Sequence, residues 1–293
     1  MKELVIISGK GGTGKTTLTA AFASLAKDKV IADTDVDAPD LHLILSPQIK
    51  HEEPFKGGHY AIIDKEKCIQ CGECRELCRF HAINEEFEIN PIDCEGCGVC
   101  VHFCPQEAIN FPQRTCGKWF ISETRFGPMV HAQLDIGQEN SGLLATLVRQ
   151  QAKIIAEDRG YDLIIVDGPP GVGCPVIASV TGASVVMIVT EPSPSGLHDL
   201  ERVWQLAFKH FGIPCLACIN KFDLNPTFSE KIETFCKKNQ ITLVGKIPFD
   251  PKVTEAVVQA KTVIEIKASV TSLVAQMWEK IYKHLYGQKR IYL

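Results

Sequence analysis

Short, almost wholly apolar runs recur along the chain and alternate with segments of helical periodicity. A run that is apolar at nearly every position predicts a strand covered on both faces, which is typical of parallel sheets. Parallel strands need long crossovers, and the helical segments between the runs provide them. The pattern therefore predicts an α/β fold with helices on both sides of a parallel sheet. The predicted strands are residues 4–8, 29–33, 161–167, 183–190, 214–220 and 242–247.

Two predicted helices and one predicted loop add to this outline. Residues 15–27 have alanine and leucine on one face, which predicts a helix after the first strand. Residues 47–58 are rich in turn formers and predict a loop. We expect the last helix to pack on the sheet rather than bind a membrane, because its apolar stripe is short and Glu279 offsets the basic residues. The residues of this stripe are Leu273, Met277, Ile281 and Leu285.

Residues 61–111 interrupt the alternation and contain an internal repeat with a fixed offset of 26 residues. Apolar positions repeat together with cysteines, and Ile63 for example corresponds to Ile89. We therefore expect a pseudosymmetric domain, residues 60–111, inserted into a larger domain formed by residues 1–59 and 112–293. In the order of the repeat, Cys68, Cys71, Cys74, Cys78, Ala82 and Ile83 correspond to Cys94, Cys97, Cys100, Cys104, Ala108 and Ile109.

The composition disfavours several classes of protein. The 293 residues are 45% hydrophobic, which is enough for a large core, and the formal net charge is −4 without a polybasic tail. General nucleic-acid binding is therefore disfavoured. No apolar stretch approaches the roughly 20 residues of a membrane-spanning helix, and the amino terminus lacks the layout of an export signal. We expect a cytoplasmic protein with no nucleic-acid partner and no membrane span.

Residues 9–16 read Gly-Lys-Gly-Gly-Thr-Gly-Lys-Thr and match the phosphate-loop pattern between a strand and a helix. The glycines let backbone N–H groups converge on phosphate oxygens, and the helix N-terminus adds its dipole. Lys15 is expected to reach the β and γ phosphates, and the Thr16 hydroxyl to bind Mg²⁺. A glycine-rich turn with an incidental lysine is the alternative. The predicted nucleotide-binding residues of this loop are Gly9, Lys10, Gly11, Gly12, Thr13, Gly14, Lys15, Thr16 and Thr17.

Lys10 is a second lysine at the start of this loop. With it, the loop resembles that of the deviant Walker A ATPases, the MinD/ParA/Mrp group that also includes the nitrogenase iron protein. The resemblance covers about residues 1–47 and 113–268. It implies a P-loop NTPase fold, slow Mg²⁺-dependent ATP hydrolysis, and a nucleotide-dependent homodimer or a heterodimer with a related ATPase. Lys10 would then point to the phosphates of the second subunit, and Lys10, Lys15 and Asp35 are the predicted catalytic residues.

The same resemblance assigns residues farther along the chain. Asp35 ends a segment similar to switch I, where it would orient water or a magnesium-bound water. Residues 163–171 resemble the Walker B strand and switch II, with Asp167 holding Mg²⁺ through water. A carboxylate that ends a buried strand is costly unless it is paired or near a cation, which favours this magnesium role over plain capping. Asn220 and Pro248 fall where the family contacts adenine.

Thirteen cysteines in a chain expected to be cytoplasmic indicate metal ligation rather than disulfides, because reducing compartments keep thiols free. Eight of them form two C-x2-C-x2-C-x3-C runs, a spacing that chance does not explain. The first three cysteines of a run can surround one corner of a [4Fe–4S] cluster, whereas the fourth is too far along the chain to close the same cluster. Structural zinc is the alternative, and the x3 spacing and the duplication disfavour it.

Over its full length the insert resembles the two-cluster bacterial ferredoxins, a small α+β fold in which the fourth cysteine of each run binds the other cluster. One departure is visible, because Arg79 follows the first run where Pro105 follows the second. We therefore do not expect equal reduction potentials. The resemblance implies one cluster held by Cys68, Cys71, Cys74 and Cys104 and another held by Cys94, Cys97, Cys100 and Cys78.

Other cysteines lie outside the two runs. Cys215 and Cys218 belong to an apolar run and predict two core thiols rather than a metal pair, because residues three apart in a strand point to opposite faces. Cys116 and Cys174 are expected to be small buried side chains. A role for either as a labile or intersubunit ligand is the alternative.

A phosphate loop and a two-cluster insert in one chain support three hypotheses. The favoured one is an ATPase in which ATP binding and hydrolysis gate electron transfer through two [4Fe–4S] clusters to a partner protein. The second is a scaffold or carrier similar to the Mrp group, which would deliver iron and sulfur to an apo-protein; crossed ligation, which should hold clusters tightly, disfavours it. The third is a non-redox positioning or partitioning switch, which would need a membrane helix or a DNA-binding charge.

Overall fold

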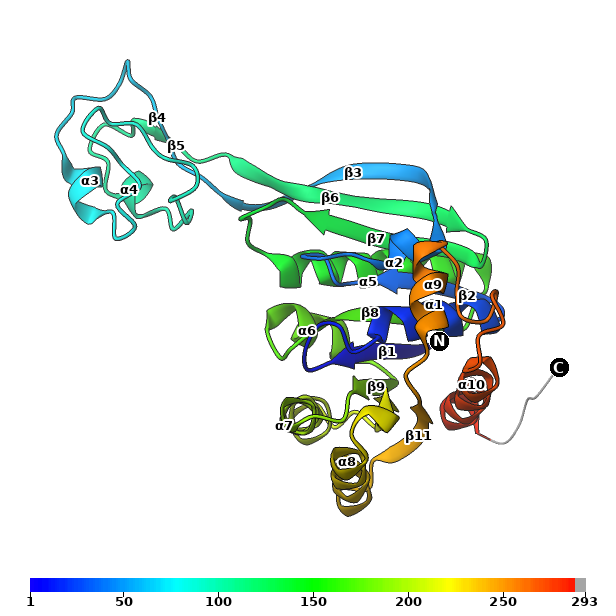
Figure 1. The fold of residues 1–293 in the computed structure, drawn as a ribbon. Coiled ribbons are helices and arrows are strands. Elements are labelled where there is room, and N and C mark those ends of the chain that lie inside the picture. Colours follow the sequence, from blue (N-terminus) through cyan, green and yellow to red (C-terminus); the bar gives the residue numbers. More distant parts are fainter. Residues whose placement is uncertain (288–293) are drawn as a thin grey trace. The chain divides into compact units, whose positions relative to one another are not determined.

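The computed structural model describes residues 1–287. Its largest sheet has nine strands in the order β11-β10-β9-β1-β8-β2-β7-β6-β3, and a separate small sheet pairs β4 with β5 (Figure 1). The strands are β1 (Lys2–Ser8), β2 (Lys29–Asp33), β3 (Gln48–His59), β4 (Ile62–Ile63), β5 (Ile109–Asn110), β6 (Gln113–Thr124), β7 (Gly127–Leu134), β8 (Leu163–Pro170), β9 (Val185–Thr190), β10 (Cys215–Asn220) and β11 (Thr242–Ile247). The α-helices are α1 (Lys15–Leu25), α2 (Leu41–Leu45), α3 (Glu73–Leu77), α4 (Val99–His102), α5 (Ser141–Arg159), α6 (Cys174–Val180), α7 (Pro194–Trp204), α8 (Pro226–Lys238), α9 (Pro251–Val258) and α10 (Thr271–Tyr286).

The centre of the large sheet is parallel. β1 lies between β8 and β9, β2 pairs with β8, and β10 lies between β9 and β11, all in parallel register. Val5 of β1, for example, lies opposite Val166 on one side and Val186 on the other. The prediction of a parallel α/β sheet is confirmed for these central strands, and all the strands predicted from apolar runs are present.

The outer strands β3, β6 and β7 were not predicted, and the interpretation of residues 47–58 as a loop is wrong. β3 spans Gln48–His59 and is the last strand of the sheet, and ten of its twelve residues are exposed. An edge strand exposed to solvent needs no apolar run and tolerates proline, so its sequence resembles that of a loop. β6 and β7 are joined by only two residues and run in opposite directions, so the sheet is mixed at this end (Figure 1).

The core lies on both faces of the central strands because their side chains alternate. Leu4 and Ile6 of β1 pack in one cluster with Phe22 of α1 and with α10. Val5 and Ile7 are also fully buried, and they point to the opposite face. Glycine appears where no side chain fits: a Cβ at Gly168 of β8 would lie 2.5 Å from Cγ2 of Ile7.

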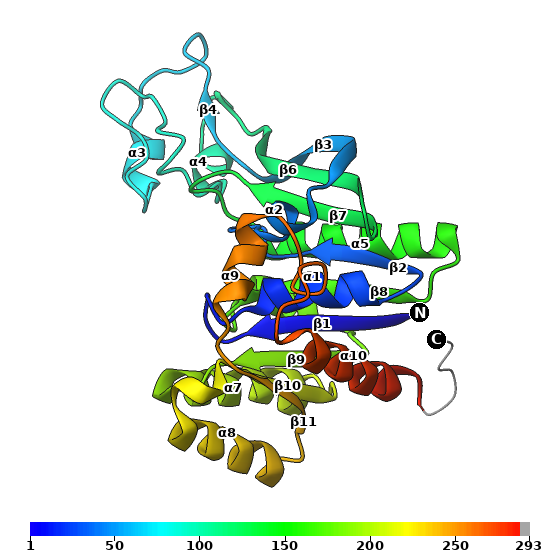
Figure 2. The same ribbon diagram turned by 45° about the vertical axis from the view of Figure 1, so that its right-hand side comes forward.

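The packing of the last helix on the core is confirmed, with one correction. α10 lies beside α1 (Figure 2). Met277, Ile281 and Leu285 of α10 are buried, and the ring centroid of Trp278 lies 5.7 Å from that of Phe22 on α1. Leu273, however, is 36% exposed, and the neighbouring Val274 is buried in its place. The buried stripe therefore follows steps of three and four residues, as the 3.6-residue helical period requires.

Two compact units divide the described chain. The first comprises residues 1–53, residues 119–133 and the chain from Ser141 onward, and the second comprises Pro54–Lys118 and Leu134–Asn140. β3 and β6 each begin in one unit and end in the other. None of the helices in residues 1–287 has the length and apolar character that crossing a membrane requires.

His131 of β7 is a buried titratable group in the first unit. Its ring stacks on that of Phe120 at a centroid distance of 4.9 Å and on that of His42 of α2 at 6.3 Å. Its Nε2 lies 2.9 Å from the Ser122 hydroxyl. Burial, together with His42, lowers the pKa of His131 to about 4.

A histidine whose pKa falls on folding stabilises the native state above its unfolded pKa, and this stability is lost as pH falls toward the folded value. We therefore expect wild-type protein to lose about 2–3 kcal/mol of unfolding free energy through His131 between pH 7 and pH 4.5. His131→Gln should remove that part of the loss in urea denaturation at the two pH values. His210→Gln, a change at an exposed histidine, is the control. Equal pH dependence in wild type and His131→Gln would contradict this assignment.

Candidate functional site

The loop between β1 and α1 presents its backbone at the N-terminus of a helix. Gly12 and Gly14 have φ values of 78° and 89°, the left-handed region that glycine adopts without strain. A Cβ on Gly14 would lie 2.4 Å from Nδ2 of Asn220, whereas no atom lies within 4 Å of a Cβ built on Gly11 or Gly12. No side chain caps the first turn of α1. Free N–H groups and the helix dipole at such a loop favour an anion.

Lys15, the first residue of α1, is a buried cation held between carboxylates. Its Nζ lies 3.3 Å from Oδ2 of Asp35 and 3.3 Å from Oδ2 of Asp167. Burial lowers the pKa of Lys15, but Asp167, Asp35 and Asp33 outweigh burial and raise it above its ordinary value. The two carboxylates compensate the charge of the buried ammonium group. Phosphate oxygens are the natural competitors for the same ammonium group.

Asp167 lies at the carboxyl half of β8 and is fully buried. Its Oδ2 accepts a hydrogen bond from the Thr16 hydroxyl at 2.7 Å, and its Oδ1 accepts one from the Thr19 hydroxyl at 2.8 Å. α1 is thereby joined to β8 through both carboxylate oxygens. Thr19 was not predicted as part of the site, because its place one turn beyond Thr16 has no separate signature in the sequence.

Asp33 is a third buried carboxylate that the sequence interpretation missed. It accepts backbone N–H groups from Asp35 at 3.1 Å and from Leu41 at 3.3 Å, which fixes both ends of the segment between β2 and α2. Burial, and next the carboxylate of Asp167, raises the pKa of Asp33 well above its ordinary value. Burial likewise raises the pKa of Asp35, against the opposing effect of Lys15. The position of Asp33 at the end of an apolar strand, two residues before Asp35, was the sequence signal that could have placed Asp33 in the site.

Lys10 points away from Lys15 toward the segment after β9. Its ammonium group pairs with Glu191 and donates to the Ser195 hydroxyl at 3.2 Å. Glu191 also lies 3.7 Å from Nζ of Lys221, and that Nζ donates to the carbonyl oxygen of Gly12 at 3.2 Å. The two lysines of the loop therefore have separate partners within the single chain.

Asn220 and Pro248 lie at the ends of neighbouring strands. Asn220 is opposite Ile247 in the register of β10 and β11, and Pro248 follows Ile247 directly. The Asn220 side chain donates from Nδ2 to the carbonyl oxygen of Thr13 at 2.8 Å, so it also supports the loop. The buried hydroxyl of Thr13 has no hydrogen-bond partner among the described residues. Thr17 is half-buried on the first turn of α1.

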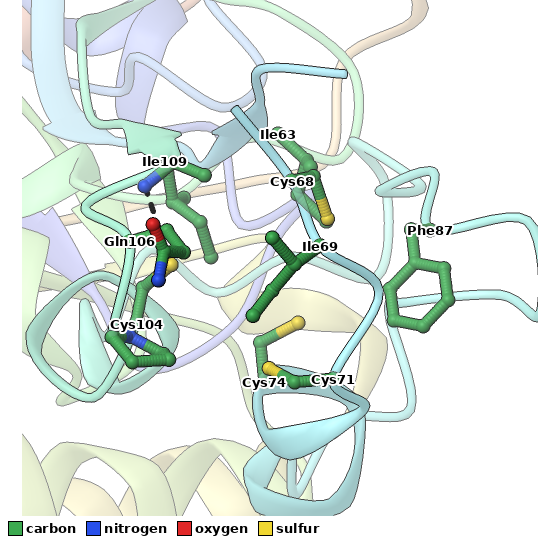
Figure 3. A pocket seen from close by; sticks show the side chains of 11 residues that line it. Ile63, Cys68, Ile69, Cys71, Cys74, Phe87, Cys104, Gln106 and Ile109 are labelled. Atoms are coloured by element: carbon green, nitrogen blue, oxygen red, sulfur yellow. Dashed lines mark hydrogen bonds between the residues drawn. The ribbon is translucent and has the colours of Figure 1, made fainter. Parts of the chain in front are cut away.

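The second unit contains two cavities, and the cysteines of each come from both halves of the repeat. Figure 3 shows the first cavity, in which cysteine side chains lie around an apolar space that includes Ile63 and Ile109. The cysteines that line it are Cys68, Cys71, Cys74 and Cys104. Those that line the second are Cys78, Cys94, Cys97 and Cys100. Each cavity thus has three cysteines from one run and the last cysteine of the other.

Crossed pairing of the backbone produces this arrangement. Ile63 at the start of the first copy pairs with Ile109 at the end of the second, and Ile89 pairs in the same antiparallel sense with Ile83. α3 and α4 each follow a glycine of positive φ, Gly72 and Gly98, which are 26 residues apart. Because each copy begins beside the end of the other, the last cysteine of each run lies across from its own three.

The thiols within each quartet are close enough to affect one another. Burial, and then Cys94, Cys97 and Cys74, raises the pKa of Cys100 to about 11. The two cavities are neighbours, because Cys74 and Cys100 pack in one cluster and α3 contacts α4. Among residues 1–287, no three histidine, cysteine, aspartate or glutamate side chains converge enough to hold one metal ion. An iron–sulfur cluster does not require its cysteines to converge on one metal ion, because each thiolate binds a separate iron.

The predictions for cysteines outside the two runs are confirmed for some residues and wrong for one. Cys215 and Cys218 are buried in β10, which confirms them as core thiols, and burial raises the pKa of each to about 12. Cys116 is also buried, and its thiol donates to the carbonyl oxygen of Gly57 at 2.8 Å. The expectation of a buried side chain is wrong for Cys174, which is exposed at the start of α6. A short helix that begins after a glycine-rich loop leaves its first residue in solvent.

Residues 4–263 match the CobQ/CobB/MinD/ParA nucleotide binding domain. The chain belongs to this family. It is 31% identical over 284 residues to the uncharacterized protein MJ0578 of Methanocaldococcus jannaschii, covering 95% of this chain and 96% of that protein. The fold is similar to that of MinD from Pyrococcus horikoshii OT3, solved in complex with Mg-ADP, with a TM-score of 0.60 at 18% identity and 99% coverage of both chains.

Two further similarities cover only a short part of the chain. The chain is 45% identical over 47 residues to the pyruvate synthase subunit PorD of Methanothermobacter marburgensis, which covers 16% of this chain and 58% of that subunit. Another partial match, 33% identical over 66 residues, is to Ferredoxin-3 of a Nostoc species, and it covers 15% of this chain and 68% of that protein. Part of the chain is thus similar in sequence to a pyruvate synthase subunit and to a ferredoxin.

The buried ammonium group of Lys15 gives a direct test of the nucleotide site. Lys15→Ala should lower ATP affinity by roughly 100-fold or more, because a charge-assisted hydrogen bond to phosphate is lost. Lys10→Ala is the matched control and should keep its affinity within about threefold, because Lys10 contacts Glu191 and Ser195 instead. Titration with a fluorescent ATP analogue measures both. Tight binding by Lys15→Ala would refute the role of Lys15.

Proposed function

We propose that this protein is an ATPase in which ATP binding and hydrolysis gate electron transfer through two [4Fe–4S] clusters to a partner protein. The observation that carries the proposal is the pair of cavities in the second unit, each lined by one complete crossed quartet of cysteines. A phosphate loop on the same chain, with a buried lysine between carboxylates, supplies the nucleotide half. We propose a cytoplasmic location, because iron-binding thiols require a reducing compartment.

The nucleotide half of the proposal uses the family's activity and this chain's own contacts. Residues 9–17 would surround the phosphates, with Lys15 on the β and γ phosphates. Thr16, Asp35 and Asp167 would hold Mg²⁺ directly or through water. Since Thr16 donates to Asp167 at 2.7 Å, these two side chains are already adjacent at the same end of α1. Asn220 and Pro248, at the ends of paired strands, are the proposed adenine contacts.

The cysteine half of the proposal assigns residues 60–111 to an inserted ferredoxin domain. The donor set fits the clusters, because four cysteines and mostly apolar residues line each cavity. The 47-residue match to PorD has nearly the length of this insert. The first cluster would be held by Cys68, Cys71, Cys74 and Cys104, and the second by Cys78, Cys94, Cys97 and Cys100. When bound, such clusters supply one-electron transfer.

Arg125, in the turn between β6 and β7, offers a route by which nucleotide state could act on the outer strands. Its guanidinium donates to the carbonyl oxygens of Ile44 and Leu45, at the carboxyl end of α2, at 2.9 and 2.8 Å. It also donates to Glu265 at 2.8 and 3.0 Å. α2 follows Asp35 and begins at the Asp33-bound Leu41. A change around Asp35 would therefore reach the turn from which β6 and β7 extend.

Dimerisation is part of the proposal through Lys10. In the single chain its ammonium group is paired with Glu191 and is only partly exposed. We propose that this pair exchanges for the phosphates of a second subunit, either a second copy of this chain or a related ATPase. Lys10→Ala, which should retain ATP affinity, is then expected to weaken nucleotide-dependent dimerisation and hydrolysis.

Crossed ligation predicts a specific pattern of iron loss. Anaerobically purified protein should contain about eight irons and eight sulfides per chain. Cys68→Ser/Cys104→Ser removes two ligands of one proposed cluster and should leave about four irons. Cys94→Ser/Cys104→Ser removes one ligand from each cluster and should leave far fewer. If Cys94→Ser/Cys104→Ser retained more iron than Cys68→Ser/Cys104→Ser, each cluster would be ligated within one run. Colourless protein that contains zinc would overturn the cluster proposal.

Gating predicts that nucleotide changes electron transfer from reduced clusters. We expect Mg-ATP to alter the rate at which the reduced protein reduces a one-electron acceptor dye, with Mg-ADP and no nucleotide as comparisons. Arg125→Gln should reduce this nucleotide effect by more than half, since it removes the bonds between α2 and the β6–β7 turn. Its iron content and ATP affinity should be unchanged. Arg202→Gln, on the exposed surface of α7, is the matched control.

A nucleotide effect that survives in Arg125→Gln would remove this residue from the route, and no nucleotide effect in wild type would overturn gating itself. Release of the clusters to an apo-ferredoxin, measured in the same samples, would instead support the carrier hypothesis.

A further inference from the structure

The two cavities of the cysteine unit are related by the 26-residue repeat, so their lining residues can be compared position by position. The apolar walls are alike. Ile63, Ala108 and Ile109 line the first cavity, and their counterparts Ile89, Ala82 and Ile83 line the second. The two sites differ at other lining positions, where the two copies of the repeat have different residues.

The residue that follows the first cysteine of each run is neutral in one copy of the repeat and acidic in the other. Ile69 follows Cys68 and lines the first cavity, and Figure 3 shows its side chain among the cysteines. Its counterpart, Glu95, follows Cys94 and lines the second cavity. Among the lining residues of the two cavities, Glu95 alone has a carboxylate. Gln106, a neutral amide, lines the first cavity where Phe80 lines the second.

We infer that Glu95 makes the second cavity, with Cys78, Cys94, Cys97 and Cys100, the site of the cluster with the lower reduction potential. This inference rests on the proposed function, since it requires that both cavities hold clusters. Reduction adds one negative charge to a cluster, and the carboxylate of a residue that lines its cavity makes that addition less favourable. Ile69 at the matching place in the first cavity has no such effect.

Arg79 is the charged residue that could oppose Glu95, because it follows Cys78. Both side chains are exposed, so water screens both charges, but Glu95 is among the residues that line the second cavity and Arg79 is not. Its counterpart, Pro105, lines the first cavity and has no charge. Glu95 therefore determines the sign of the difference.

The order of the two reduction potentials gives a direction of electron flow. Cys74 of the first quartet and Cys100 of the second belong to one packed cluster, and α3 contacts α4, so the two sites are close neighbours. An electron accepted in the second cavity would pass to the first with a favourable free energy and remain there. The first cavity is then the exit toward the acceptor, whose reduction potential must be higher still. The donor must be a one-electron reductant of lower potential than the second site.

The experiment is a redox titration of the anaerobically purified, cluster-loaded full chain, followed by electron paramagnetic resonance. Wild type should show two reduction steps. Glu95→Gln should raise only the lower midpoint, so that at a fixed potential near that midpoint the reduced-to-oxidised ratio increases several-fold. Glu95→Asp should retain the wild-type midpoint, because the charge is kept. Glu86→Gln, an exposed glutamate of the same unit outside both cavities, is the matched control.

The pseudosymmetry allows the reciprocal test. Ile69→Glu should lower only the upper midpoint, and the double change Ile69→Glu/Glu95→Ile should exchange the order of the two sites. If Glu95→Gln moves the upper midpoint or neither midpoint in protein with full iron and sulfide content, the inference is wrong while the cluster proposal stands. Absence of iron and sulfide from wild type would instead defeat the proposed function. A lower midpoint that falls further in Arg79→Gln than it rises in Glu95→Gln would assign the control of potential to Arg79.

Discussion

The buried charge cluster at the start of α1 constrains the arrangement of the central strands. Lys15 is almost completely buried, and its ammonium group lies 3.3 Å from carboxylate oxygens of both Asp35 and Asp167. A buried charge without a partner would cost several kcal/mol, so the segments that supply these carboxylates must end at the same edge of the sheet. The parallel order of β1, β8 and β2 places them there. The same geometry prepares the loop for an anion, since phosphate oxygens can replace the carboxylates around Lys15.

Hydrogen bonds to these carboxylates connect the charge cluster to α1 and to the segment before α2. Asp167 accepts hydrogen bonds from two threonines of α1, and Asp33 holds the backbone on both sides of Asp35. At the far end of α2, Arg125 binds the last carbonyl oxygens of the helix. Each of these contacts is a directional hydrogen bond to a charged group, and such bonds are stronger than neutral ones. The nucleotide site and the outer strands are thus joined by a continuous set of contacts within the first unit.

In the cysteine unit, the constraint is the dependence of each half on the other. Ile63 pairs with Ile109, and Ile83 pairs with Ile89, so neither copy of the repeat completes its sheet contacts or its cysteine quartet alone. Duplication gives the two cavities matching isoleucine and alanine positions in their linings. The linings differ at other positions, where for example Ile69 lines one cavity and its counterpart Glu95 lines the other.

The sequence alone predicted the features that depend on local patterns: the buried parallel strands, the phosphate loop, and the repeat with its two cysteine runs. These are encoded in neighbouring residues, because burial on both faces and close backbone approach restrict residue types locally. The outer strand β3 was missed because an exposed edge strand places few apolar demands on its sequence. Only the tertiary structure decided that Lys10 pairs with Glu191, that Asp33 holds Leu41, and that Arg125 binds Glu265 across 140 residues of sequence. Two of these contacts join side chains far apart in the chain and the third crosses a loop, and no local pattern records which of many possible partners the fold brings within hydrogen-bond distance.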